Sequence, residues 1–178
     1  MQSSPPTSDD SPLEQMIVVV MGVSGSGKST TGAALARMLG WPFVEGDDLH
    51  PPGNVAKMAA GVPLTDDDRW PWLDRIVAEL RARSPQSPGI VLACSALKQS
   101  YRDRLAPAGD VRFVHLHGDR ETIAARLAVR QHRYMPATLL DSQFATLEPP
   151  RDAIDVDIEA SVEEQVRSIV DALGVRPR

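Results

Sequence analysis

An eight-residue stretch near the start of the chain combines three glycines with a lysine and a serine. It reads Gly22-Val23-Ser24-Gly25-Ser26-Gly27-Lys28-Ser29, with Thr30 next, and matches G-x-x-x-x-G-K-[ST] at every fixed position. Glycines allow successive backbone N–H groups to converge on an anion, and a helix starting behind them adds the positive end of its dipole. Lys28 can reach the β- and γ-phosphates, and the Ser29 hydroxyl can bind Mg²⁺. The stretch predicts a site for a nucleoside triphosphate and Mg²⁺.

Two acidic residues follow the next expected strand, Pro42-Phe43-Val44. Open α/β sheets bind ligands beyond the carboxyl ends of their strands, so Glu45 and Asp47 should face the phosphates. In phosphoryl transfer, one carboxylate can hold a Mg²⁺-bound water while another accepts the proton of the attacking hydroxyl. We predict the metal role for Glu45 and the base role for Asp47. The alternative for Asp47 is a solvated acidic turn before a proline.

Apolar runs and helical patterns alternate along the chain and would position these residues. Strands are expected at residues 16–21, 42–44, 90–94, 111–117 and 154–158. Helices are expected at residues 30–39, 54–60, 119–130 and 136–144. A longer helix should begin between residues 66 and 71, another should follow residue 98 and end at 105, and a last one should follow a capping box at 161–164. Uninterrupted apolar strands and this alternation predict a parallel sheet with helices on both faces. We expect one α/β domain over residues 14–176, a three-layer P-loop NTPase sandwich with five strands, after a disordered tail at residues 1–13.

Composition limits the partners and the compartment. The 178 residues carry a net charge of −5 and form no basic block, which argues against binding to nucleic acid. Cys94 is the only cysteine, so no internal disulfide can form. No apolar run approaches the length of a membrane span, and the start does not resemble a signal peptide. We expect a soluble cytoplasmic protein without a membrane partner.

Two sequence features narrow the kind of nucleotide site. The chain has no Asn-Lys-x-Asp segment to recognise guanine, which argues against a GTPase switch. The third expected strand ends in Cys94-Ser95, where motor-type ATPases carry an aspartate for Mg²⁺. The carboxylates after the second strand therefore favour a small-molecule kinase.

Five ordered blocks resemble the gluconokinase family of small P-loop kinases. They are Gly22 to Ser29, Gly46 to Pro51, Pro63 to Arg69 with Pro71 to Leu73, Cys94 to Lys98 with Tyr101-Arg102, and Ser142 to Glu148. The resemblance covers about residues 16 to 173. It implies ATP-dependent phosphorylation of D-gluconate on its 6-hydroxyl, an adenylate-kinase-like fold, a mobile lid at about residues 126–148, and a homodimer.

Further site residues follow from the pattern and from the resemblance. Arg126, Arg130 and Arg133 are spaced as on one helical face and could contact a triphosphate, with a solvated basic face as the alternative. We predict Lys28, Asp47, Arg126 and Arg130 as catalytic. Arg69 could bind the gluconate carboxylate or pair with adjacent aspartates, and His50 could bind substrate hydroxyls or brace the Pro51-Pro52 turn. The resemblance adds four substrate residues: Ser95, Lys98, Arg102 and Gln143.

The chain departs from the family pattern at two places. Glu45 stands where the family usually has aspartate, and Arg133 stands where it has histidine, with His132 one residue earlier. A shikimate- or nucleotide-kinase-like enzyme is the alternative within the same fold. A non-catalytic ATP-binding sensor is the alternative from another class, although Asp47 beside a complete phosphate loop argues against it.

Overall fold

A five-stranded parallel sheet forms the centre of the molecule. A computed structural model describes residues 15–129 and 139–178, without the side chain of residue 84. The strands are β1 (Met16–Met21), β2 (Phe43–Glu45), β3 (Gly89–Ala93), β4 (Asp110–His117) and β5 (Ala153–Asp157). They lie in the order β2-β3-β1-β4-β5, and every neighbouring pair is parallel. This confirms the predicted α/β P-loop kinase fold.

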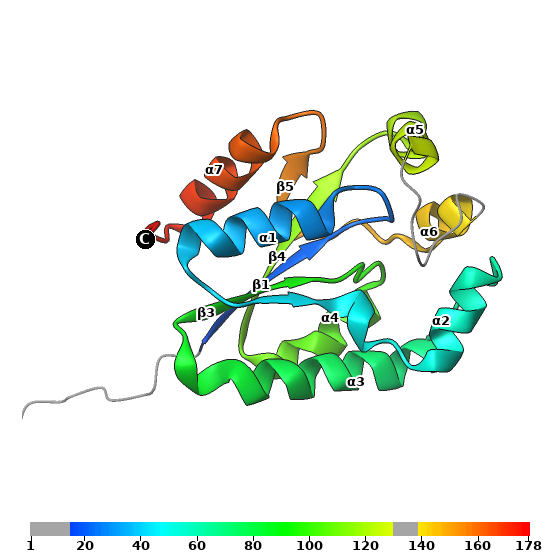
Figure 1. The fold of residues 1–178 in the computed structure, drawn as a ribbon, viewed down its shortest axis with the longest axis horizontal. Helices are drawn as coiled ribbons and strands as arrows, with labels where there is room; N and C mark the ends of the chain where they lie inside the picture. Colours follow the sequence, from blue (N-terminus) through cyan, green and yellow to red (C-terminus); the bar gives the residue numbers. More distant parts are fainter. Residues whose placement is uncertain (1–14, 130–138) are drawn as a thin grey trace, which may run out of the picture.

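Helices cover both faces of this sheet (Figure 1). The α-helices are α1 (Lys28–Leu39), α2 (Pro52–Ala59), α3 (Asp66–Arg83), α4 (Gln99–Leu105), α5 (Arg120–Val129), α6 (Leu140–Thr146) and α7 (Val162–Leu173). Three short 3₁₀ turns are η1 (Gly46–Leu49), η2 (Ser84–Gln86) and η3 (Ala106–Ala108). Helices α1 and α7 pack on one face and α3 and α4 on the other, while α2, α5 and α6 lie toward the carboxyl ends of the strands (Figure 1).

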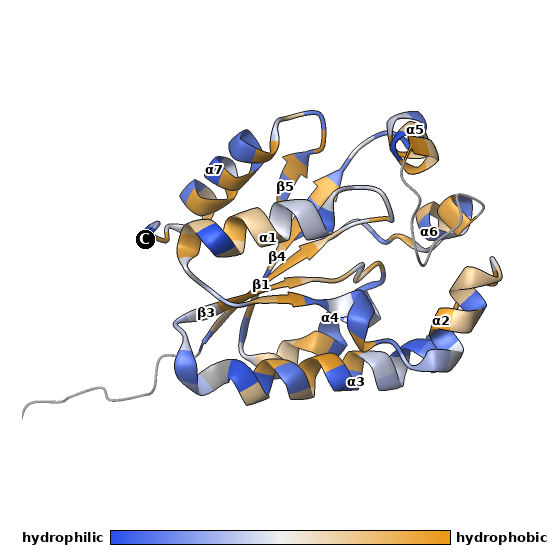
Figure 2. Ribbon diagram, viewed as in Figure 1, coloured by the Kyte–Doolittle hydropathy of each residue, from blue (hydrophilic) through white to orange (hydrophobic). Residues whose placement is uncertain are grey.

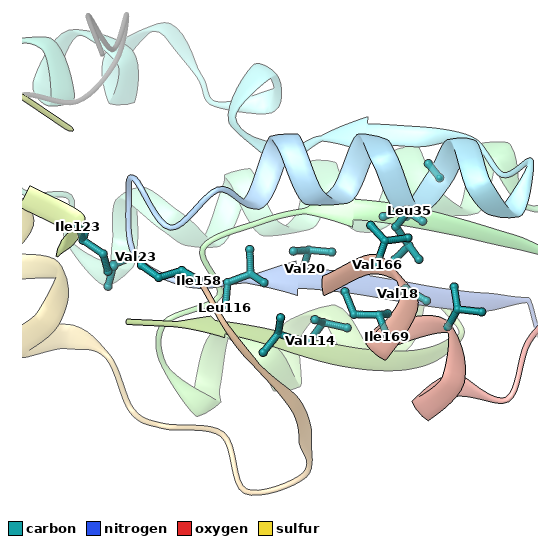
Figure 3. Close-up of a cluster of buried hydrophobic side chains, with 14 of the residues drawn as sticks. Val18, Val20, Val23, Leu35, Val114, Leu116, Ile123, Ile158, Val166 and Ile169 are labelled. Carbon is teal, nitrogen blue, oxygen red and sulfur yellow. The ribbon is translucent and has the colours of Figure 1, made fainter. Parts of the chain in front are cut away.

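The apolar strands β1 and β3 bury both of their faces, as their sequences predict. On β1, Val18 and Val20 pack beneath α1 and α7, whereas Ile17 and Val19 pack against α3 and α4. Figure 2 shows the hydrophobic strands between helices with polar outer faces, and Figure 3 shows the first cluster, in which α7 packs over the strands. Because β1 pairs with both β3 and β4, its carboxyl end is held at the centre of the sheet. The glycine-rich loop begins there.

The last helix is fixed by the predicted capping box. Ser161 Oγ accepts from the Glu164 backbone N–H at 3.2 Å, and a Glu164 carboxylate oxygen accepts from the Ser161 N–H at 2.8 Å. Inside the molecule, Thr31 on α1 donates to Gln165 on α7 at 2.6 Å. These contacts hold the β5–α7 turn close to the phosphate loop.

Several expectations lie outside the described residues. They are the tail at residues 1–13, Arg130, His132, Arg133 and part of the expected lid. Within the described ranges, no helix is long and apolar enough to cross a membrane.

Candidate active site

The phosphate loop requires glycine for two distinct reasons. Gly25 and Gly27 have φ angles of +81° and +94°, a left-handed conformation that costs other residues energy. A Cβ atom on Gly22 would lie 2.7 Å from the Leu116 carbonyl oxygen, so this position lacks room for a side chain. The loop then leads into α1 at Lys28. Backbone geometry therefore shapes an anion site at the amino end of a helix.

Lys28 folds back over this loop. Its Nζ donates to the Val23 carbonyl at 3.0 Å. Burial lowers the pKa of Lys28, and the nearby carboxylates of Asp47 and Glu45 oppose that shift. The amine therefore lies between the phosphate loop and the two acidic residues.

Ser29 and Glu45 meet as the metal prediction requires. The Ser29 hydroxyl donates to the Glu45 carboxylate across the space between α1 and β2. Burial raises the pKa of Glu45, while the Ser29 hydrogen bond lowers it. A hydroxyl and a carboxylate are hard oxygen ligands, which fit Mg²⁺. No cluster of three or more His, Cys, Asp or Glu residues suited to a metal occurs among the described residues.

One pocket brings together most of the predicted substrate residues. We call it the acceptor pocket, and its lining includes Ser24, Lys28, Asp47, His50, Arg69, Ser95 and Gln143. These residues come from the phosphate loop, η1, the ends of β2 and β3, α3 and α6. Gln143 accepts from the Ser24 backbone N–H at 2.6 Å, which joins α6 to the phosphate loop. Asp47 thus lines the same pocket as Lys28 and Arg69.

His50 is held in a single orientation and protonation state. Its ring stacks on Trp72 with centroids 4.0 Å apart, and the Trp72 indole donates to the Gly46 carbonyl at 2.8 Å. The Asn54 amide N–H₂ donates to the Asp68 carbonyl at 2.9 Å and lies 3.2 Å from His50 Nδ1. Nδ1 must therefore accept, so Nε2 carries the hydrogen, 3.8 Å from Asp47 Oδ1. Burial lowers the pKa of His50 to about 4, so the ring is neutral at pH 7.

Arg69 is anchored without an ion pair. Its Nη1 donates to the Leu64 carbonyl at 2.6 Å and to the Tyr101 hydroxyl at 3.1 Å. The adjacent aspartates have other partners: Asp66 pairs with Lys98 at 3.1 Å, and Asp68 pairs with Lys57 at 2.8 Å. None of the ion pairs within the described ranges involves Arg69. The structure therefore does not show the alternative given above, in which Arg69 forms an ion pair with an adjacent aspartate.

Comparisons with known proteins identify the family of this chain. A family model described as an AAA domain matches residues 17–150. The gluconokinase of Gluconobacter oxydans is 52% identical over 143 residues, 79% of this chain and 79% of that protein. The probable gluconokinase of Xenopus tropicalis is 45% identical over 168 residues, 83% of this chain and 88% of that protein. The chain belongs to the gluconokinase family. A crystal structure of a gluconokinase from Sinorhizobium meliloti matches with a TM-score of 0.77 and 49% identity, over 88% of this chain and 90% of that chain.

Two residues predicted to touch substrate lie elsewhere in this gluconokinase-family chain. Arg102 is 3% exposed, and its guanidinium donates to the carbonyls of Ala96, Leu97 and Glu148 at 2.8, 3.2 and 2.8 Å and to the Gln99 side chain. Lys98 pairs with Asp66, and neither residue lines the acceptor pocket. Arg102 instead joins the carboxyl end of β3 to the segment after α6. Arg102 therefore has a structural role as a brace, which means that its hydrogen bonds hold these two segments together.

A second pocket adjoins the phosphate loop and shares no lining residue with the acceptor pocket. We call it the β5–α7 pocket, and it is lined by Gly25, Ser26, Gly27, Thr30, Thr31, Arg126, Ile158, Ala160, Ser161, Val162 and Gln165. Arg126 Nη2 donates to the Ile158 carbonyl at 2.7 Å. Arg126 is thus separated from Asp47, and its predicted catalytic role stays a prediction.

Sequence reasoning did not identify Gln165 or Tyr101 as site residues. Gln165 is 4% exposed and interrupts the apolar face of α7 three residues after Val162, which was the available signal. Tyr101 belongs to a family block, but nothing in its spacing indicated a contact with Arg69. The contact between Thr31 and Gln165 and the contact between Arg69 and Tyr101 each join residues that are distant in the sequence.

Proposed function

We propose that this chain transfers the γ-phosphoryl group of ATP to the 6-hydroxyl of D-gluconate, in keeping with its membership of the gluconokinase family. The observation that carries the proposal is the acceptor pocket, in which Lys28, Asp47 and Arg69 face one space. A phosphate-binding cation, a carboxylate base and a carboxylate-binding guanidinium are the groups that this reaction needs.

The phosphate end of the site would hold ATP and Mg²⁺. The loop N–H groups and Lys28 would bind the phosphates, and Lys28 would stabilise negative charge on the transferring group. Ser29 and Glu45 would hold the metal, directly or through water. Mg²⁺, when bound, neutralises charge on the phosphate oxygens.

At the acceptor end, Asp47 would orient the 6-hydroxyl and accept its proton. His50 would donate from Nε2 to a substrate hydroxyl, because Asn54 already donates to Nδ1. Arg69 would bind the carboxylate of gluconate at the other end of the substrate. Ser95 and Gln143 line the same space and would contact the hydroxyls between.

The β5–α7 pocket is our candidate for the nucleoside part of ATP. It is lined by Gly27 of the phosphate loop, Thr30 of α1 and Arg126. A planar guanidinium can stack on a base. We retain Arg130 as a predicted phosphate contact and a homodimer as a proposal from the family resemblance. The cytoplasmic location is a proposal from the single cysteine and the absence of a signal-peptide pattern in the sequence.

A coupled ADP-release assay tests the proposed reaction. Purified protein is given ATP and Mg²⁺ with gluconate, other sugar acids, sorbitol, shikimate or nucleoside monophosphates in turn. We expect gluconate to be the best acceptor and sorbitol, which has no carboxylate, to be poor. Preferential turnover of shikimate or a nucleotide would overturn the proposal, and so would ATP binding without turnover of any acceptor.

A further inference from the structure

A polar chain links Arg69 to residues outside the acceptor pocket. Arg69 Nη1 donates to the Tyr101 hydroxyl at 3.1 Å, and that hydroxyl donates to the Asp66 carboxylate. Lys98 Nζ donates to both oxygens of the same carboxylate, at 3.1 and 3.3 Å. Of these four residues, only Arg69 lines the pocket.

The chemistry of each group fixes the direction of every hydrogen bond. A guanidinium only donates, an ionised carboxylate only accepts, and a phenol has one hydrogen and free lone pairs. The Tyr101 hydrogen must therefore point to Asp66, and its lone pair must accept from Arg69. Burial and the Asp66 hydrogen bond raise the pKa of Tyr101 to about 12, so the phenol keeps its hydrogen. The hydrogen bonds from Tyr101 and Lys98 lower the pKa of Asp66, which keeps it ionised.

This arrangement fixes one edge of the Arg69 guanidinium. Nη1 has two hydrogens, and they go to the Leu64 carbonyl and the Tyr101 hydroxyl. The Arg69 Cζ atom also lies 5.2 Å from the centre of the Tyr101 ring. Because the guanidinium is planar, anchoring Nη1 sets the plane of the remaining edge, formed by Nε and Nη2. Within the described residues, that edge makes no hydrogen bond, and a carboxylate can accept two parallel hydrogen bonds from it.

We propose that Tyr101 and Asp66 are positioning residues that orient Arg69 toward the carboxylate of the acceptor. The inference rests on the proposed contact between Arg69 and gluconate. It assigns a role in substrate selection to a tyrosine that is only 1% exposed and does not line the pocket. A purely structural Tyr101, packed edge-on against Trp70 at 5.6 Å, is the competing explanation.

Tyr101→Phe separates the two explanations because it keeps the ring and removes the hydroxyl. We expect the KM for gluconate to rise about 3- to 10-fold, the scale of one lost hydrogen bond. The kcat and the KM for ATP should stay within about twofold, since neither phosphate contacts nor Asp47 change. Trp70→Phe is the matched control, because Trp70 packs on the same ring and does not line the pocket. An equal rise in gluconate KM in the Trp70 variant would indicate packing alone and overturn the inference.

A double-mutant cycle shows whether Tyr101 acts through Arg69. In an Arg69→Ala background, Tyr101→Phe should not raise the gluconate KM further, because the group that it positions is gone. Independent, multiplicative effects would overturn the inference. Asp66→Ala gives a second measurement should Tyr101→Phe fold poorly, because it removes the acceptor of the Tyr101 hydrogen bond at a side chain that is 46% exposed. We expect the same selective rise in gluconate KM.

The cycle also distinguishes this inference from the proposed function. If Arg69→Ala raises the gluconate KM and Tyr101→Phe does not, the positioning role is wrong and the carboxylate contact stands. If Arg69→Ala leaves the gluconate KM unchanged, the carboxylate contact is wrong and the positioning role falls with it. D-Gluconamide, which has the same hydroxyls and no negative charge, should lose the sensitivity to Tyr101→Phe.

Discussion

The two ends of the active site are built in different ways. The phosphate end is a continuous segment, in which the carboxyl end of β1, three glycines and the start of α1 follow one another. Its binding groups are mostly backbone N–H groups, which any sequence with the right glycines can present. The acceptor end is assembled from separate segments: Asp47 and His50 after β2, Arg69 on α3, Ser95 after β3 and Gln143 on α6. Phosphate binding is thus a local property of the chain, whereas acceptor choice depends on tertiary packing.

The largest effect is expected from Lys28→Met, which removes the cation from the phosphate end. We expect kcat to fall by about 10³-fold or more, because charge on the transferring group loses a fixed partner. The same substitution at Lys57 is the matched control, since Lys57 pairs with Asp68 on the surface. Steady-state kinetics with circular dichroism checks the result. A folded Lys28→Met protein with near-normal kcat would remove the basis for the phosphate site.

Asp47→Asn tests the proposed general base, which lines the same pocket as Lys28 of the phosphate end. The amide keeps the shape of the side chain but cannot accept a proton, and general-base catalysis is worth about 10²- to 10⁴-fold in rate. We expect kcat to fall on that scale with little change in ATP affinity. Asp48→Asn is the control, because Asp48 is the exposed neighbour and lines no part of the acceptor pocket. Should weakened ATP binding be the main defect, Asp47 belongs with the metal and not with the acceptor.

The contrast between the two ends explains what the sequence could predict. The phosphate loop, the five strands and the Ser161 capping box depend on neighbouring residues, and the structure has each of them within a few residues of the predicted bounds. Placing Glu45 beside Ser29 required only the rule that strand ends gather at one edge of a parallel sheet. These features follow from local propensity and apolar pattern.

The predicted substrate residues that do not line the acceptor pocket, and the site residues that the sequence did not indicate, make contacts across long stretches of sequence. Arg102 carries a charge in a family block, so a substrate role was a natural interpretation. The Arg102 guanidinium is held by the carbonyl of Glu148, which is 46 residues away, and by the carbonyl of Ala96, which follows β3. Tyr101 likewise reaches Arg69 across 32 residues. Residue type cannot reveal such partners, because each arginine has several possible acceptors in the folded chain.

Arg102→Met tests whether Arg102 stabilises the fold by joining the end of β3 to the segment after α6. The expected effect is smaller than at Lys28 or Asp47. Methionine retains an apolar stem but leaves the buried carbonyl of Ala96 without the Arg102 donor, and it removes the Arg102 hydrogen bonds to the carbonyls of Leu97 and Glu148. This should lower the free energy of unfolding by about 1–3 kcal/mol. The KM values for ATP and gluconate should change together, unlike the selective change expected at Arg69. Arg104→Met is the control, since Arg104 makes an exposed pair with Asp74, and exposed ion pairs contribute little to stability. Chemical denaturation would contradict the brace if Arg102→Met were as stable as Arg104→Met.

The smallest effect concerns the pH dependence of stability at the acceptor end. His50 has a pKa near 4 in the folded protein because burial and the Arg69 charge lower it more than Asp47 raises it, against about 6.5 in an unfolded chain. Between these values the unfolded chain binds a proton that the folded chain does not, so stability falls as the pH falls.

His50→Gln removes this linkage and keeps a neutral polar side chain. From pH 7 to pH 5, wild type should lose about 1–2 kcal/mol of unfolding free energy more than the variant, since each pH unit below the unfolded pKa costs at most about 1.4 kcal/mol. Above pH 7 the difference between the two proteins should be constant, because His50 is neutral in both states. Urea denaturation at pH 5, 6, 7 and 8 measures the difference. Parallel losses in the two proteins would mean that His50 is already protonated in the folded state, and its Nδ1 could then not accept from Asn54 as the structure shows.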